Sequence, residues 1–471
     1  MRMPLFGLGQ VGKSVTATAQ SRSNCYVEIS NEPDKTQITL YRRSGLDLFD
    51  SFGDTPPRGA IDLGNFNYVV HRGTFWEQNN SAIKTSRGTL TTTSGFVSMS
   101  SDGNTIHIVD GVNSYIYNTT TLVFTQSVSV NYVPAVTNTW IDGYFISDRR
   151  GSANQAEHNR YSWSLDGITY NALDFNSAAA SPDKIQRVYS DNRQLILFGE
   201  VTTEFHTNTG NLDLPFTRVA TNEWGLAAVF SVAKFNASFI FLGQNRMGKT
   251  QVMVLNGYSP QIVSTPEMST VIDSYGIVSN AVGRSSMEGG HAFYYLTFPS
   301  VGKTWLFDSV SALWQQVTSG ITEGQYRGIF SNNFLGRTLV YDYANGNVYQ
   351  ENTNSYTDNG DMVVVEVTSK HIFGETLINI GRLWLDMETG VGLASSQGSS
   401  PMIILKISKD GGQTYPIERL ASIGAIGKYR QRPYFNRVCL SRDCVIKIRI
   451  TDPVKVVITG AYLDNNIGVN G

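Results

Sequence analysis

Short apolar and aromatic runs alternate with turns from residue 59 to residue 362. A typical unit is Thr105–Val109, then Asp110-Gly111, then Ser114–Tyr117. Asp-Gly between alternating runs is a strong signal of an antiparallel hairpin. Hairpins recur roughly every 40–50 residues, which is the spacing of four-stranded propeller blades. The pattern predicts a β-propeller-like body of about six blades whose first and last blades meet. A stack of β-sandwiches is the alternative.

Longer and more apolar strands are expected within residues 363–471. Met402–Ile407, Val445–Ile450 and Val454–Ile458 are the clearest of them. Runs of this kind between turns are typical of strands that pack face to face. We therefore predict a compact C-terminal β-sandwich domain over residues 363–471.

Residues 1–58 have a mixed pattern. Their start is rich in glycine, and strands are expected around Asn24–Ile29 and Thr36–Tyr41. We predict an N-terminal arm with a few strands that packs on the C-terminal domain or on neighbouring molecules. The one helix that the pattern suggests is Pro266–Tyr275, so the predicted fold class is all-β.

Composition supports this class and narrows the function. Charged residues make up only 16% of the 471 residues, and glycines number 44, which suits short strands and tight turns. The net charge is −2, whereas a protein that grips nucleic acid by its phosphates is basic. No stretch approaches 18 uninterrupted apolar residues, so we expect no membrane-spanning segment. Three cysteines argue against a disulfide scaffold and fit a reducing cytosol.

One segment fits the phosphate-binding pattern G-x-x-x-x-G-K-[ST], from Gly7 to Ser14. That loop functions when a strand precedes it and a helix follows, because the helix N-terminus then faces the phosphates. Only six residues precede Gly7, and the β-branched residues after Ser14 do not favour a helix start. We interpret the match as a glycine-rich arm and predict no nucleotide cofactor.

A second motif matches the Asp-box, S-x-D-x-G-x-T-W, with tyrosine in place of tryptophan. Its residues are Ser408, Asp410, Gly412, Thr414 and Tyr415, and Ser164–Tyr170 is a near match that is one residue shorter. Asp-boxes occur in sialidases and in many other propellers, where the aspartate binds turn amides. A sialidase also needs an arginine triad and a nucleophile pair, and no arrangement of residues marks either one. We predict a structural turn.

No other constellation indicates catalysis or metal binding. The six histidines lie far apart in the sequence, and Cys439 and Cys444 lack a second pair of ligands. No G-x-S-x-G elbow is present. We therefore predict that the protein is not an enzyme and has no catalytic residue, no cofactor and no metal site.

A basic and aromatic cluster is unusual in a chain with so little charge. Aromatic side chains at Tyr429, Tyr434 and Phe435 interleave with its cations. Such a pattern suits nucleic-acid binding or a protein interface, and we favour an interface with another copy or a partner. The cations are Lys428, Arg430, Arg432, Arg437 and Arg442.

Three stretches carry a resemblance to a known family. The first is Ser21-Arg-Ser-Asn24-Cys-Tyr26-Val-Glu28. The second runs from Leu195 to Thr265 and includes Thr203-Glu204-Phe205, Pro215-Phe216-Thr-Arg218 and Gly257-Tyr258-Ser-Pro260. The third comprises Asp410-Gly-Gly412, Gly427-Lys-Tyr429-Arg-Gln-Arg432 and Ile450-Thr-Asp452-Pro453. In this order they resemble the packaged-DNA-stabilisation or tail-nozzle (hub) proteins of short-tailed bacteriophages. Cys439 and Leu226 depart from the family pattern.

The resemblance implies a structural virion protein of the phage tail, assembled in the host cytoplasm. Such proteins form a cyclic homo-oligomer, typically a hexamer, below the portal and its adaptor (head-completion) protein. The implied partners also include tail spikes or fibres, a tail plug or needle, and double-stranded DNA that crosses the lumen without tight binding. A sialidase-like carbohydrate-active propeller and a receptor-binding propeller remain alternatives.

Overall fold

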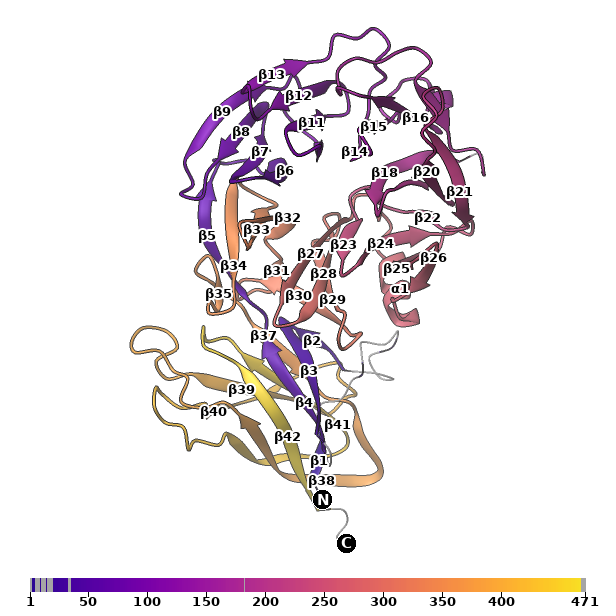
Figure 1. Ribbon diagram of the computed structural model, residues 1–471. Coiled ribbons are helices and arrows are strands. Elements are labelled where there is room, and N and C mark those ends of the chain that lie inside the picture. The colour runs from indigo at the N-terminus through magenta and orange to yellow at the C-terminus, as the bar shows by residue number, and fades with distance from the viewer. Residues whose placement is uncertain are drawn as a thin grey trace.

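The computed structural model describes residues 2–4, 9, 14, 20–32, 35–181 and 183–466. Two bodies are visible in it: a ring of β-sheets and, beside one sector of the ring, a β-sandwich that holds both chain ends (Figure 1). The sheets of the ring are antiparallel, and their strands succeed one another along the chain through tight turns. The predicted all-β propeller with a C-terminal sandwich is confirmed.

The first four blades of the ring have four strands each. In every blade the strands follow sequence order, so each blade is a meander of hairpins. Their strands are β6 (Pro57–Leu63), β7 (Phe66–His71), β8 (Thr74–Gln78) and β9 (Lys84–Thr89); β10 (Ser98–Ser101), β11 (Thr105–Val109), β12 (Ser114–Asn118) and β13 (Val123–Gln126); β14 (Asn138–Ile141), β15 (Tyr144–Asp148), β16 (Arg160–Ser164) and β17 (Phe175–Ser177); and β18 (Ile185–Asp191), β19 (Gln194–Gly199), β20 (Thr203–Asn208) and β21 (Phe216–Asn222).

The next two blades carry additional elements. The fifth includes the short inner strands β22 and β23 and is followed by helix α1, and the sixth extends into a larger sheet. A 3₁₀ turn, η1 (Gln155–Glu157), lies earlier, in the third blade. The elements are β22 (Gly225–Leu226), β23 (Ala233–Phe235), β24 (Ser238–Gln244), β25 (Thr250–Asn256), β26 (Ser259–Ile262) and α1 (Pro266–Asp273), then β27 (Val282–Glu288), β28 (His291–Phe298), β29 (Lys303–Asp308), β30 (Trp314–Ser319) and β31 (Gly324–Gln325).

The last blade is completed by a strand from the other end of the chain. Strands β32 (Gly328–Phe334), β33 (Arg337–Asp342) and β34 (Asn347–Asn352) are joined at the outer edge by β5 (Gly45–Ser51), which pairs antiparallel with β34. The short strands β35 (Thr357–Asp358) and β36 (Asp361–Met362) extend the same sheet. Because β5 comes just before β6, the first and last blades are tied together by consecutive residues.

The ring closes on itself, as predicted. Neighbouring blades contact one another around the whole circle, and β32 of the last blade contacts β6 of the first. In the described part of the chain, seven sheets each contribute one blade, whereas the sequence pattern predicted about six blades. The estimate came from the average spacing of the hairpins, which gives an approximate blade number.

The sandwich is built from both ends of the chain. Its buried core combines Cys25, Val27 and Leu40 with apolar residues from the C-terminal strands. Residues 1–58 therefore divide between the two bodies, with β3 and β4 in the sandwich and β5 in the propeller. The sandwich strands are β1 (Arg2–Pro4), β2 (Arg22–Ser23), β3 (Cys25–Glu32), β4 (Lys35–Arg42), β37 (Val365–Thr368), β38 (Ile372–Met387), β39 (Met402–Ser408), β40 (Ile417–Ser422), β41 (Tyr434–Ile450) and β42 (Val457–Asn466).

One continuous sheet joins the propeller to the sandwich. Strand β30, at the outer edge of the sixth blade, pairs with β2, which pairs with β37, which pairs with β41 of the sandwich. The hydrogen-bonded path from β27 to β3 therefore crosses the domain boundary without a break. A shared sheet resists hinge motion, because bending it would break the backbone hydrogen bonds of the ladder.

The predicted helix is present as α1. Thr265 caps it by accepting the Met268 N–H at 3.2 Å, and Pro266 occupies the first turn. Met268 and Ile272, one turn apart, are buried in the core of the fifth and sixth blades. None of the helices in the described ranges has the length and apolar character needed to span a bilayer.

Candidate functional site

The predicted Asp-box is a turn closed by its own side chains. The Ser408 hydroxyl donates to Asp410 Oδ1 at 2.6 Å and accepts the Gly412 N–H at 2.8 Å. Asp410 also accepts the Thr414 N–H at 2.9 Å and the Thr414 hydroxyl at 2.5 Å. Hydrogen bonds from Ser408 and Thr414 lower the pKa of Asp410 to about 2. Lys447 Nζ lies 4.6 Å from the Tyr415 ring centroid, which fixes the ring at the base of the turn.

The near match at Ser164–Tyr170 has the same internal bonding. Asp166 accepts the N–H groups of Ile168 and Thr169 at 3.0 and 2.7 Å, and Ser164 accepts the Gly167 N–H at 2.9 Å. The Tyr170 side chain is buried, and its hydroxyl donates to the Gly167 carbonyl at 3.1 Å. Both aspartates are thus engaged by their own turns, which is a structural use of the carboxylate.

The five predicted interface cations are all exposed, but they do not form one cluster. Lys428 and Arg430 lie in the loop before β41, while Arg437 and Arg442 lie along β41 itself. Arg432 forms an ion pair with Asp386 of β38 at 2.8 Å. The extended strand separates cations that are close in sequence, because successive residues advance by about 3.3 Å and alternate between faces.

The structure brings together a row of aromatic side chains, of which the sequence pattern had singled out only Tyr434. Trp384 of β38 lies directly opposite Tyr434 of β41 and Tyr462 of β42. Their neighbours Leu383, Phe435 and Leu463 point into the core and are buried. The only sequence signal was the alternation of apolar and polar residues in each strand, which does not show which strands are neighbours.

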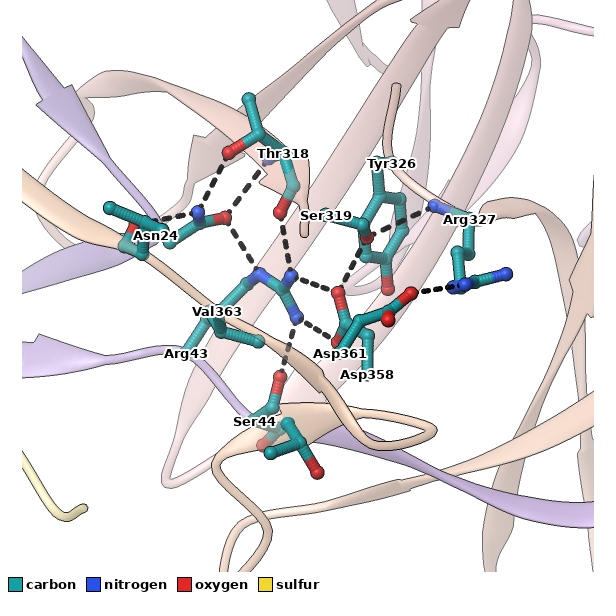
Figure 2. Close-up of polar contacts among 12 residues, drawn as sticks. Asn24, Arg43, Ser44, Thr318, Ser319, Tyr326, Arg327, Asp358, Asp361 and Val363 are labelled. Carbon is teal, nitrogen blue, oxygen red and sulfur yellow. Dashed lines mark hydrogen bonds and ion pairs between the residues drawn. The ribbon is translucent and has the colours of Figure 1, made fainter. Parts of the chain in front are cut away.

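A buried ion pair lies where the propeller meets the sandwich (Figure 2). Arg43 binds Asp358 through two parallel hydrogen bonds, Nη1 to Oδ1 at 2.9 Å and Nη2 to Oδ2 at 2.6 Å. Its remaining N–H groups donate to Asn24 Oδ1 and to the carbonyl oxygens of Ser44 and Thr318. All five donors of the guanidinium are therefore satisfied. Burial opposes the charge on Arg43, but Asp358 raises the pKa of Arg43 above its usual value.

Arg42, the residue before Arg43, binds the sandwich side of the boundary. Arg42 donates to the carbonyl oxygens of Asp452 and Val454 at 2.8 and 2.7 Å, and to that of Val363 in the connection between the domains. Among the described residues no acidic side chain forms an ion pair with Arg42, and burial lowers the pKa of Arg42 to about 9. Consecutive residues thus hold the propeller, the linker and the sandwich together.

Buried histidines and cysteines have structural surroundings. His291 Nδ1 lies 2.8 Å from Asp308 Oδ1, and His206 Nε2 lies 2.9 Å from Glu204 Oε2. Cys25, Cys439 and Cys444 are all free and buried, and burial raises the pKa of Cys25 to about 12. Within the described ranges, no group of three or more histidine, cysteine, aspartate or glutamate side chains is arranged to hold a metal ion.

A hollow of about 900 Å³ opens between the first blade and the last two blades. Arg58, Phe96, Pro299 and Tyr343 are among its lining residues. Arg58 is not available to a ligand there, because its guanidinium donates five hydrogen bonds to the loops around Arg72 and residues 92–95. The Gly7–Ser14 motif lies outside the described residues, apart from Gly9 and Ser14.

Family models account for both bodies of the structure. A model described as "Bacteriophage P22 Gp10, beta-propeller" matches residues 20–356, and one described as "Bacteriophage P22 Gp10, beta-sandwich" matches residues 366–465. The chain belongs to the bacteriophage P22 Gp10 family. It is therefore a phage structural tail protein, and its boundary between propeller and sandwich falls between residues 356 and 366.

Comparisons with curated proteins and with solved structures add only a distant structural similarity. No curated protein matches the sequence. The N-terminal domain of Nup159 is similar at a TM-score of 0.40 and 11% identity, covering 70% of this chain and 98% of that one. The computationally designed Ika8 protein has a TM-score of 0.39 and 9% identity, over 70% and 96%. PorZ of Porphyromonas gingivalis has a TM-score of 0.40 and 10% identity, over 72% and 44%. These values carry no information about function.

Proposed function

We propose that this protein forms the tail nozzle, or hub, of a short-tailed bacteriophage. In this role, identical copies make a ring that extends the portal channel, retains packaged DNA and conducts it during ejection. The observation that carries the proposal is the family match across both the propeller and the sandwich. We further propose a hexamer located in the virion tail and assembled in the host cytoplasm.

The architecture suits a load-bearing part. Retained DNA exerts pressure on the tail. A subunit with a flexible connection between its propeller and its sandwich would deform under that pressure. Here the sheet from β30 through β2 and β37 to β41 and the buried Arg43–Asp358 pair join the two bodies. The proposed contacts of the ring are the adaptor below the portal, the spikes or fibres, and the plug or needle. DNA would pass without tight binding, in keeping with a net charge of −2.

The proposed role is not enzymatic. Both turns of the Asp-box type use their aspartates to bind turn amides and hydroxyls. The motif that suggested a carbohydrate-active propeller therefore has a structural explanation in this protein. Purified protein should show no activity on chromogenic glycosides, and activity lost on Asp410→Ala substitution would revive the enzymatic alternative.

Genetic complementation tests the function directly. A phage with an early stop codon in this gene should fill its heads with DNA and then lose that DNA. The wild-type chain supplied in trans should restore retention and infectivity. Lys13→Ala should complement equally well, because the glycine-rich segment is not expected to bind nucleotide. Particles that retain DNA and infect without the chain would refute the proposal.

A further inference from the structure

The outer face of the sandwich sheet carries an ordered row of aromatic residues. Tyr434, Trp384 and Tyr462 lie side by side on β41, β38 and β42, at matched positions of an antiparallel ladder. Adjacent strands are about 4.8 Å apart, so the three rings form a stripe across the strands. Two positions further along the ladder, Arg382 lies opposite Asn436 of β41 and Asp464 of β42. We refer to Arg382, Trp384, Arg432, Tyr434 and Tyr462 as the aromatic–arginine face.

Local packing holds this face in place. Gly460 makes room for the Tyr462 ring, because a Cβ at Gly460 would meet Tyr462 Cε2 at 2.7 Å. Arg382 donates from Nε to Asn436 Oδ1 at 2.7 Å, and its guanidinium carbon is 5.5 Å from the Trp384 ring centroid. The Arg432 guanidinium carbon is 5.8 Å from the same centroid. Preorganised side chains lose little conformational entropy on binding.

Such a face has the composition of a protein contact. Tryptophan, tyrosine and arginine dominate the residues that contribute most to protein–protein binding energy. Tyr434 is 53% exposed, and Arg382 and Arg432 are also exposed. Trp384 and Tyr462 are half-buried. None of these five side chains belongs to the buried core of the sandwich, which lies on the other face of the sheet.

The distribution of charge indicates the partner. Residues 366–465 contain 13 lysines and arginines against 9 aspartates and glutamates, whereas the rest of the chain contains 24 against 30. The sandwich is therefore basic and the remainder, which is mostly propeller, is acidic. A ring made of identical subunits repeats one contact between two different surfaces of the subunit. Opposite net charges on the two bodies favour contact between the sandwich of one copy and the propeller of the next.

We propose that the aromatic–arginine face binds the acidic propeller of a second copy of this chain. The proposal rests on the proposed ring and deepens it by naming the surface that makes the contact. It places the contact on Trp384, Tyr434 and Arg382, rather than on the loop that contains Lys428 and Arg430. Arg382 is suited to bind a carboxylate of the neighbour, because it is exposed and its planar guanidinium can donate two parallel hydrogen bonds.

The test compares single substitutions by analytical ultracentrifugation of the full-length protein. Trp384→Ala and Tyr434→Ala should each weaken association about tenfold or more, because they remove central aromatic contacts. Phe373→Ala is the matched control: Phe373 is on the same strand and 78% exposed, but it lies at the other end of β38. The control should associate like the wild type. Arg382→Glu, an exposed change that leaves the core intact, should weaken association through charge reversal.

Each outcome decides the question. Wild-type rings together with unchanged rings of Trp384→Ala, Tyr434→Ala and Arg382→Glu would overturn the inference and leave the proposed nozzle standing. A wild-type chain that never assembles, alone or in particles, would count against the nozzle itself. Binding of single-stranded DNA or of a neutral oligosaccharide to the wild type, lost in Trp384→Ala while rings persist, would assign the face to that ligand and overturn the inference. Thermal melting establishes that each variant is folded.

Discussion

At the scale of single residues, two consecutive arginines define the boundary between the bodies. Arg43 turns to Asp358 and Thr318 of the propeller, and Arg42 turns to the carbonyl oxygens of Asp452 and Val454 in the sandwich. Burying a charge is costly unless every donor finds an acceptor. The bidentate pair and the surrounding acceptors meet that requirement for Arg43, whereas the buried Nε of Arg42 has no hydrogen-bond partner among the described residues. Position 43 should therefore tolerate little change.

The Arg43–Asp358 pair provides the first prediction. Asp358→Asn leaves the guanidinium buried without its counter-ion and should lower the free energy of unfolding by about 3–5 kcal/mol. Asp54→Asn is the matched control, because Asp54 pairs with Arg72 at the surface with side-chain exposures of 80% and 56%. The control should cost less than about 1 kcal/mol. Urea denaturation measures both, and equal small losses would show that the buried pair is dispensable.

His107 provides a prediction about pH. It is buried between Ser114 Oγ, 2.8 Å from Nε2, and Asn138 Nδ2, 3.0 Å from Nδ1. Burial lowers the pKa of His107 from 6.5 to about 3. Between these pH values the His107 side chain is protonated in the unfolded chain but neutral in the folded protein. The free energy of unfolding therefore falls as the pH decreases from about 6.5 to about 3. Melting temperatures of wild type and His107→Gln across this range should show a shallower acid decline in the variant, and parallel curves would contradict the assignment.

At the scale of elements, local sequence signals predicted most hairpins and turns, but they did not predict which distant strands pair with each other. The hairpins, the helix at Pro266 and the turn at Asp410 were predictable, because each depends on residues a few positions apart. Residues 45–51 were assigned to the arm and no strand was predicted there, because nothing in the local sequence shows that β34 is the neighbour of this segment. The aromatic row was missed for the same reason, as Trp384, Tyr434 and Tyr462 meet only through the sheet register.

Closure of the ring by β5 provides the third prediction. Leu46 is fully buried in a core cluster that includes Val340 and Tyr349 of the closing blade together with residues of the sixth blade, whereas Leu48 on the same strand is 51% exposed. Leu46→Ala should destabilise the protein by about 2–5 kcal/mol, because it removes core contacts and leaves a cavity. Leu48→Ala should cost less than about 1 kcal/mol. Equal effects in thermal unfolding would show that β5 does not hold the ring closed.

At the scale of the whole molecule, the chain is one interlocked body rather than two domains on a tether. Strands β3 and β4 give the sandwich part of its core, β5 gives the propeller its last strand, and β2 joins the two bodies. The sequence boundary near residue 362 marks where the C-terminal strands begin, but it does not separate two complete folding units. Contacts between chain ends of this kind cannot be derived from local pattern.

This interlocking provides the fourth prediction. A fragment of residues 363–471 lacks β3 and β4, and with them the buried Cys25, Val27 and Leu40. It should fail to show a cooperative melting transition, because the exposed core face has no cover. A fusion that adds residues 20–44 to the fragment through a flexible linker should restore the transition. A stable sandwich from residues 363–471 alone would contradict the account.

The central claim is that this rigid body is the repeating unit of a nozzle below the portal. Cryo-electron microscopy of intact phage particles tests it most directly. The predicted result is a ring of identical subunits coaxial with the portal, in which each density fits the propeller and sandwich in the relative orientation seen here. Density for the chain at the tip of a fibre, or particles that lack it altogether, would contradict the claim.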